Sequence, residues 1–167
     1  SKLWTPKDTN CNAKEPFELS HNHTQIDHYI DSLRDGGGTA GHQGIAWGWY
    51  LISPKWGDIF DHNAKPLPYD EPDTTKAMII MTDGEFNRQY HSGQGSSAAQ
   101  AKALCDKIKE EDVVIFTVAF QAPEDGAEVL AYCATSEEHA FKASNGAELQ
   151  ASYQSIATSI SDLRIKS

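Results

Sequence analysis

Two stretches of the chain consist almost entirely of apolar residues and have the length of a strand. They cover residues 76–82 and 113–120, and Asp83-Gly84 ends the first of them. An uninterrupted apolar run of this length is typical of a strand that helices cover on both faces, as in a parallel sheet. A shorter run at 139–143 predicts a third strand.

Between these runs, apolar residues recur every three or four positions, which is the pattern of an amphipathic helix. The predicted helices cover residues 24–34, 40–52, 97–111, 127–133 and 146–163. The segment 54–75 has four prolines and no clear period, so it is predicted to be a loop. Strands that alternate with helices predict a doubly wound α/β domain with a parallel sheet and right-handed crossovers.

Charge and length restrict what this domain does. The 167 residues predict one domain, and 14 Lys and Arg against 24 Asp and Glu leave a net charge of −10. Such an acidic chain repels phosphate backbones, so nucleic acid is not expected as a partner. No apolar run approaches the ~20 residues that cross a bilayer. The first six residues do not resemble a signal peptide, so we expect any export signal or membrane anchor outside this sequence.

Two oxygen-bearing side chains follow structural boundaries. Asp83 stands directly after a predicted strand, at the end where open α/β sheets hold ligands. Thr39 follows the glycines 36–38 and precedes a predicted helix. A carboxylate and a hydroxyl are ligands for a hard ion such as Mg²⁺. From spacing alone the alternative stays open that Asp83 begins a turn and Thr39 caps the helix.

These motifs carry a family resemblance. Gly37-Gly38-Thr39 and Met81-Thr82-Asp83-Gly84-Glu85 resemble the second and third elements of the metal-ion-dependent adhesion site of von Willebrand factor A domains. More narrowly, residues 33–54, 101–109 and 156–164 resemble the TadG-like proteins of bacterial Tad (Flp) pilus-assembly loci. The likeness begins at about Phe17. We therefore interpret 1–16 as the remnant of an insertion or linker and 17–167 as the C-terminal part of the domain.

The resemblance implies a Rossmann-like three-layer fold and a divalent ion, Mg²⁺ or else Mn²⁺ or Ca²⁺, held by Thr39 and Asp83. An acidic group of a protein partner would complete the ligand shell. It further implies a non-enzymatic binding or assembly module whose partner is a pilus-assembly component or a surface ligand. In TadG-like proteins an N-terminal helix anchors the full-length chain, and the domain lies on the periplasmic or cell-surface side of the membrane.

One element of the family pattern is absent. The Asp-x-Ser-x-Ser string that follows the first, central strand does not occur before Phe17. In TadG-like proteins an insertion separates this string from the rest, so the chain is interpreted as the fragment after that insertion. We therefore expect weak or no metal binding by this chain alone. We also expect an exposed sheet edge where the first strands are missing. Our hypothesis is that the chain dimerises through this edge.

The cysteines Cys11, Cys105 and Cys133 match no zinc or redox motif. From the residues alone, three thiols and one disulfide with an odd thiol both stay open. The resemblance implies a Cys105–Cys133 disulfide and leaves Cys11 unpaired here.

Three rival interpretations rest on weaker patterns. An Mg²⁺-dependent hydrolase or phosphotransfer enzyme would use Asp83, but no lysine or second carboxylate stands at the spacing it needs. A nucleotide loop at Gly93-x-Gly95-x-x-Ala98 lies about ten residues too far from the strand. The histidines show no ligand spacing and are expected on the solvated surface. Of the two tryptophans Trp47 and Trp49, one is expected in the core and the other beneath the 54–75 loop.

Overall fold

Three parallel strands form the centre of the molecule. The computed structural model describes residues 14–34, 38–89 and 91–166. Strands β1 (Ala77–Thr82), β2 (Val114–Phe120) and β3 (Ala140–Ala143) pair in the order β1-β2-β3. The predicted α/β class with a parallel sheet is therefore confirmed. Within the described residues, no helix combines the length and hydropathy of a membrane span.

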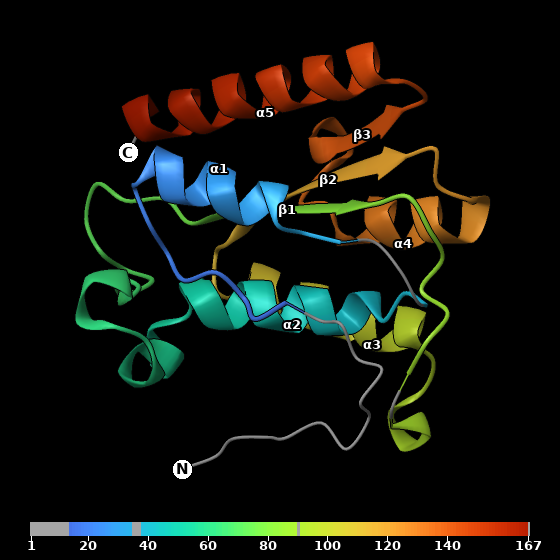
Figure 1. Ribbon diagram of the computed structural model, residues 1–167, viewed down its shortest axis with the longest axis horizontal. Helices are drawn as coiled ribbons and strands as arrows, with labels where there is room; N and C mark the ends of the chain where they lie inside the picture. Colours follow the sequence, from blue (N-terminus) through green and yellow to red (C-terminus); the bar gives the residue numbers. More distant parts are fainter. Residues whose placement is uncertain (1–13, 35–37, 90, 167) are drawn as a thin grey trace.

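Helices lie on both faces of this sheet. Figure 1 shows α5 on one side of the sheet, whereas α2, α3 and α4 lie on the other side, where α2 contacts β1 and α4 contacts β2. The helices are α1 (His23–Asp31), α2 (Gly41–Ile52), α3 (Ser97–Glu110), α4 (Glu124–Cys133) and α5 (Gly146–Lys166). Helix α1 contains no buried residue, so it contributes little to the core.

The larger core lies between the sheet and helices α2, α3 and α4. Its strand residues are Met78 and Ile80 of β1 and Ile115 and Ala119 of β2. Ile45, Ala101, Cys105, Ile108, Val129, Leu130 and Cys133 pack against them from the three helices. These residues recur at helical spacing in the sequence, which is why the apolar periodicity located the helices correctly.

A smaller core lies between the sheet and α5. Phe116 and Val118 of β2 and Ile156 of α5 are completely buried there, and Phe141 of β3 packs against them. Alternate residues of a strand point to opposite faces. Strand β2 therefore supplies both cores and is covered on both sides, as its continuous apolar run predicts.

The same prediction is wrong for β1. Ile79 and Met81 are 41% and 48% exposed, because α5 packs against β2 and β3 and does not extend over β1. Met81 still contacts α5, where the Tyr153 hydroxyl lies 3.5 Å from its sulfur. Among the described residues β1 has a neighbour on only one side, so its other edge is free.

Helix boundaries differ from the predicted ones by a few residues, most clearly in α4. This helix begins at Glu124, three residues before the predicted start, with Pro123 as its N-cap. Acidic residues in a first turn interact favourably with the helix dipole, a signal that apolar periodicity does not detect. The 54–75 segment is mostly loop as predicted, with two short 3-10 helices at Pro54–Ile59 and His62–Ala64.

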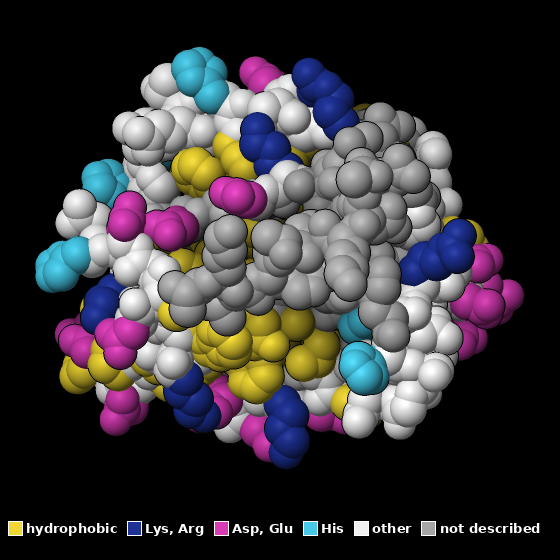
Figure 2. Space-filling model, turned by 60° about the horizontal axis from the view of Figure 1, so that its bottom comes forward, with side chains coloured by type: hydrophobic (Ala, Val, Ile, Leu, Met, Phe, Trp, Pro, Cys, Tyr) yellow, Lys and Arg dark blue, Asp and Glu magenta, His cyan; other side chains and the backbone are white. Residues whose placement is uncertain are grey.

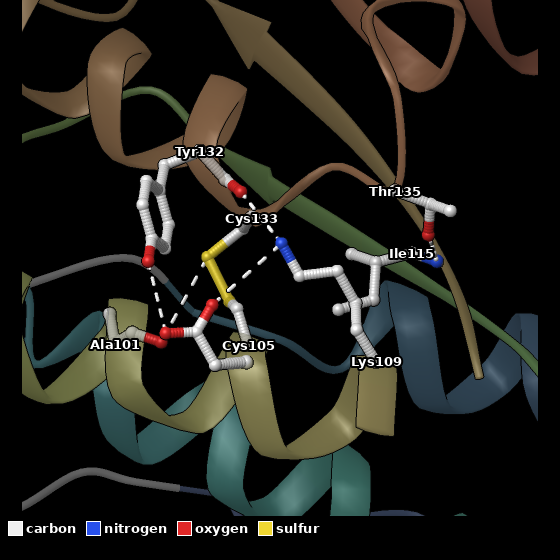
Figure 3. The surroundings of a disulfide bond; sticks show 8 residues. Ala101, Cys105, Lys109, Ile115, Tyr132, Cys133 and Thr135 are labelled. Carbon is white, nitrogen blue, oxygen red and sulfur yellow. Dashed lines mark hydrogen bonds and ion pairs between the residues drawn. A yellow bond between two sulfur atoms is a disulfide. The ribbon is translucent and has the colours of Figure 1, made fainter. Parts of the chain in front are cut away.

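A disulfide joins α3 to α4. Cys105 and Cys133 are bonded and completely buried, so the structure contains the pair that the family resemblance implies. Figure 3 shows that the bond lies beneath a set of surface contacts. Lys109 donates to the Tyr132 carbonyl and the Tyr132 hydroxyl donates to Asp106, which hold the same two helices together. Cys11 lies outside the described residues.

Candidate functional site

The carboxyl end of β1 carries the first predicted ligand. Thr82 is the last residue of the strand, and its hydroxyl accepts a hydrogen bond from the Gly84 amide at 3.1 Å. The chain therefore bends at Asp83. Its side chain is exposed and makes no hydrogen bond with another described residue. An exposed carboxylate at the carboxyl end of a parallel strand is positioned to bind a ligand from solvent.

The second predicted ligand lies beside this bend. The Thr39 amide donates to the Asn87 side chain, and the Thr39 carbonyl accepts from the amides of Asn87 and Arg88, each at 3.1 Å. A Cβ atom added to Gly84 would lie 3.3 Å from the Thr39 hydroxyl oxygen. The structure thus brings Thr39 next to the residue that follows Asp83, although 44 positions separate Thr39 and Asp83 in the sequence.

Thr39 does not cap α2, so the alternative interpretation of this residue is wrong. The N-cap of α2 is Ala40, which makes no side-chain capping bond. The alternative for Asp83 holds in part, because a bend does occur there, but the hydroxyl that stabilises it belongs to Thr82. Gly37 lies outside the described residues.

Small residues allow the loops around this site to approach each other closely. A Cβ atom on Gly126, in α4, would lie 2.4 Å from the Gly84 carbonyl oxygen. A Cβ atom on Gly41, at the start of α2, would lie 2.2 Å from the Phe86 ring. Both distances are shorter than any real contact, so only glycine fits at these positions. Sequence reasoning missed Gly126, Gly41 and Asn87, because their contacts join segments far apart in the chain.

The chemistry of these groups suits a hard divalent cation in part. A threonine hydroxyl and an aspartate carboxylate are oxygen ligands, and Mg²⁺ requires six ligands in octahedral geometry. Within the described residues, no group of three or more His, Cys, Asp or Glu side chains could hold a metal. Thr39 and Asp83 therefore fit as two members of a ligand set whose other members come from water or from another segment.

A groove runs along the free edge of β1 from this site. It has a volume of about 270 Å³, and its wall on the α2 side is built from the glycines Gly41, Gly44 and Gly48. Ile79 and Met81 of β1 line the opposite side. An apolar groove beside an unpaired strand edge can accept an additional strand, whose backbone pairs with the edge and whose apolar side chains fill the groove.

The expectation that the histidines lie on the solvated surface is wrong for His42. His42 is buried, and its Nδ1 lies 2.8 Å from the Ser97 hydroxyl, so it belongs to the interface between α2 and α3 and not to the surface. Burial lowers the pKa of His42, because the charged imidazolium loses solvation. The glycine-rich segment before α3 ends in Ser96, whose hydroxyl caps that helix by accepting from the Ala99 amide.

Neither tryptophan of α2 belongs fully to the core. Trp49 is half-buried and donates to the Tyr69 hydroxyl of the 54–75 loop at 2.8 Å, as expected for one of the pair. Trp47 is 45% exposed, and Tyr50 lies between it and Trp56, with the Tyr50 and Trp56 rings stacked. Figure 2 looks onto the α2 and α3 layer and shows hydrophobic side chains gathered on this face among Lys and Arg side chains.

A comparison with protein-family models identifies one family, and a comparison with solved structures shows a similar fold. A family model described as the von Willebrand factor type A domain matches residues 10–155. The structure of proximal thread matrix protein 1 from the mussel byssus, described with a zinc-occupied MIDAS motif, is similar at 20% sequence identity and a TM-score of 0.51. That match covers 80% of this chain and 28% of the mussel chain. At this identity the likeness shows the fold alone.

A second crystal form of the mussel protein matches at 19% identity and a TM-score of 0.45, covering 84% of this chain and 28% of that chain. This chain therefore spans less than a third of the length of the solved structures it matches. No curated protein shows significant sequence similarity to it.

Proposed function

The chain belongs to the von Willebrand factor type A domain family, and from that premise we propose that it is a non-enzymatic binding and assembly module. In this proposal a protein partner binds through a divalent cation held by Thr39 and Asp83. The observation that carries it is the position of the Thr39 hydroxyl beside Gly84, at the carboxyl end of β1 where Asp83 is exposed. An acidic side chain of the partner would then serve as a further ligand, which couples metal binding to partner binding.

The remaining protein ligands belong, in this proposal, to an Asp-x-Ser-x-Ser string at the end of a strand that pairs with β1. The free edge of β1 and the glycine-walled groove beside it support this placement. A strand parallel to β1 in that groove would end at the same edge of the sheet as Asp83. Its serine hydroxyls and carboxylate would thereby reach the cation that Thr39 and Asp83 face. Without that strand, a second copy of this chain is the proposed occupant of the β1 edge.

The biological setting that we propose is a TadG-like protein of a Tad (Flp) pilus-assembly system, with a pilus component or a surface ligand as the partner. The sequence segments 33–54 and 101–109 support this narrower assignment. The full-length protein would be membrane-anchored, with this domain on the periplasmic or cell-surface side. The buried Cys105–Cys133 disulfide supports an oxidising compartment, because cytosolic thiols are kept reduced.

The test is a calorimetric titration of Mg²⁺, Mn²⁺, Ca²⁺ and Zn²⁺ into the chain, alone and with a synthetic peptide of five apolar residues followed by Asp-Leu-Ser-Gly-Ser. We expect weak or no binding by the chain alone and saturable binding when the peptide is present. Asp83→Asn and Thr39→Val should abolish that binding. Asp27→Asn, which removes one exposed carboxylate from α1, should leave it unchanged.

Two results would contradict the proposal. Cation binding that survives Asp83→Asn would place the ion elsewhere on this acidic chain. A peptide that binds without any dependence on cations would show that the β1 edge accepts a strand but that Thr39 and Asp83 hold no metal.

A further inference from the structure

The opposite edge of the sheet carries a second and larger groove. It lies beside β3, at the opposite edge of the sheet from the free edge of β1, and has a volume of about 610 Å³. This volume is in the middle of the range of ligand-binding clefts in proteins. The groove is bounded by β3 and by the exposed side of α4.

Small side chains form the floor of this β3 groove. Ala119 of β2 and Ala127 and Ala131 of α4 line it, together with Ala122 and Ala143. Alanine side chains leave space close to the backbone of the edge strand, so another chain can approach β3 without meeting a bulky group. The floor is apolar and shallow, as a groove for an extended segment requires.

The backbone of β3 is oriented to pair with such a segment. The Gln121 amide donates to the Ala143 carbonyl at 2.9 Å, so the backbone groups of Ala143 point toward β2. These groups alternate in direction along a strand. The amides and carbonyls of Ala140 and Lys142 therefore point outward, and within the described part of the chain no further strand lies beside them.

The rim of the β3 groove is acidic. Glu124 and Glu128 lie one turn apart on the exposed side of α4, and among the described residues neither carboxylate forms an ion pair. The third rim carboxylate, Glu148, is already engaged. It accepts from the Ser144 amide at 2.8 Å and from the Ser144 hydroxyl at 2.7 Å, and these bonds lower the pKa of Glu148. Lys142 is the basic residue of the lining.

The charges indicate what kind of chain this groove accepts. Two unpaired carboxylates on the rim attract Lys or Arg side chains. A second copy of this chain is a poor occupant of this groove, because symmetric pairing through β3 would bring Glu124 and Glu128 of both copies to one interface, where they repel one another. The net charge of −10 accelerates the approach of a basic partner at low ionic strength.

We propose that the β3 groove is a second protein-binding site, where a basic, extended segment of a partner protein adds to the sheet as a strand beside β3. Main-chain hydrogen bonds to Ala140 and Lys142 hold the segment, and its Lys or Arg side chains pair with Glu124 and Glu128. This site requires no metal, and neither Thr39 nor Asp83 is among the residues that line it.

The experiment titrates the ¹⁵N-labelled chain with a synthetic peptide of alternating Arg and Val and follows the amide signals by NMR. We expect shifts confined to β3 and α4 and slower hydrogen exchange at the Lys142 amide. Glu124→Gln combined with Glu128→Gln should weaken binding roughly two- to thirtyfold, the range expected for two exposed ion pairs. Asp27→Asn combined with Asp31→Asn removes two charges from α1 and should leave the affinity unchanged.

A second peptide separates strand pairing from nonspecific attraction. It has the same sequence with every backbone nitrogen methylated, so it keeps every charge and loses all of its main-chain hydrogen-bond donors. We expect it not to bind. The proposal is overturned if the Arg-Val peptide causes no shifts at millimolar concentration, if the shifts spread over the acidic surface, or if the methylated peptide binds equally well. The proposal is also overturned if the variant with Glu124→Gln and Glu128→Gln binds the Arg-Val peptide as tightly as the double variant of α1.

Discussion

Strands β1 and β2 lie side by side and look alike in sequence, yet their environments differ. Both are continuous apolar runs, and they pair in register from Ala77 opposite Val114 to Thr82 opposite Ala119. In β2, Phe116 and Val118 are completely buried under α5. In β1, Ile79 and Met81 occupy the same face of the sheet and are almost half exposed.

The difference shows that an apolar run indicates a strand whose two faces need cover, but does not show that this chain covers both faces. On the face of α2, α3 and α4, both strands are covered, so Met78 and Ile80 are buried like Ile115. On the other face, α5 covers β2 but does not extend over β1. An apolar surface that one chain leaves uncovered indicates a binding surface, and here it adjoins the free strand edge and the Thr39 and Asp83 site.

The largest expected effect separates the two strands directly. Phe116→Ala removes a completely buried ring from β2 and leaves a cavity, so it should lower the free energy of unfolding by about 3–5 kcal/mol. Ile79→Ala, on the same sheet face of β1, should cost less than about 1 kcal/mol, because its side chain is largely in water already. Urea unfolding followed by circular dichroism measures both. Equal losses would mean that β1 is covered in solution.

The disulfide secures the covered face, and its removal is expected to have the next largest effect. Cys105→Ala combined with Cys133→Ala opens a link between residues 28 positions apart. The unfolded chain then gains conformational entropy, so the free energy of unfolding should fall by about 2–4 kcal/mol. Urea unfolding of the oxidised chain and the double variant gives this difference. A loss well below this range would show that the contacts of Tyr132 and Lys109 suffice to join α3 and α4.

The uncovered side of β1 should affect association more than stability. Ile79→Thr combined with Met81→Thr keeps β-compatible side chains and removes apolar surface beside the free edge. We expect a change in the free energy of unfolding below about 1 kcal/mol and a larger monomer fraction in sedimentation velocity runs. Ile59→Thr is the matched control, because Ile59 is 47% exposed and lies in the 3-10 helix Pro54–Ile59 of the 54–75 segment. Unchanged self-association would argue against a dimer through β1.

Much of the fold could be predicted because it depends on local periodicity. The alternation of apolar strands with amphipathic helices identified the α/β class and each of the described strands and α-helices, but not the short 3-10 helices. The incomplete cover of β1 could not be predicted, since it depends on where α5 crosses the sheet, and that is set by contacts such as Ile156 with Phe116, 40 positions apart. The spacing of apolar residues within one element does not reveal contacts between elements that are far apart in the sequence.

The candidate site shows the same division. Asp83 and Thr39 could be placed at one end of the sheet, because a strand end and a helix start are visible in the sequence. The hydrogen bonds between Asn87 and the backbone of Thr39, and the need for glycine at positions 41 and 126, arise only when distant loops meet. The free edge of β3 and its acidic rim were likewise invisible, because Glu124 lies in the part of α4 that periodicity missed.

The smallest expected effect is a pH dependence that arises in the covered layer. His42 lies between α2 and α3, and burial lowers its pKa below the ordinary 6.5, so the folded chain binds this proton less readily than the unfolded chain. Stability is therefore complete above about pH 6.5 and is lost as the pH falls through the lowered pKa of the folded state. The melting temperature of the wild-type chain should fall more steeply than that of His42→Gln between neutral and mildly acidic pH. His28→Gln, on exposed α1, should keep the wild-type slope. If His42→Gln kept that slope as well, the imidazole would be accessible to protons in the folded chain, and the α2–α3 layer would be open to water.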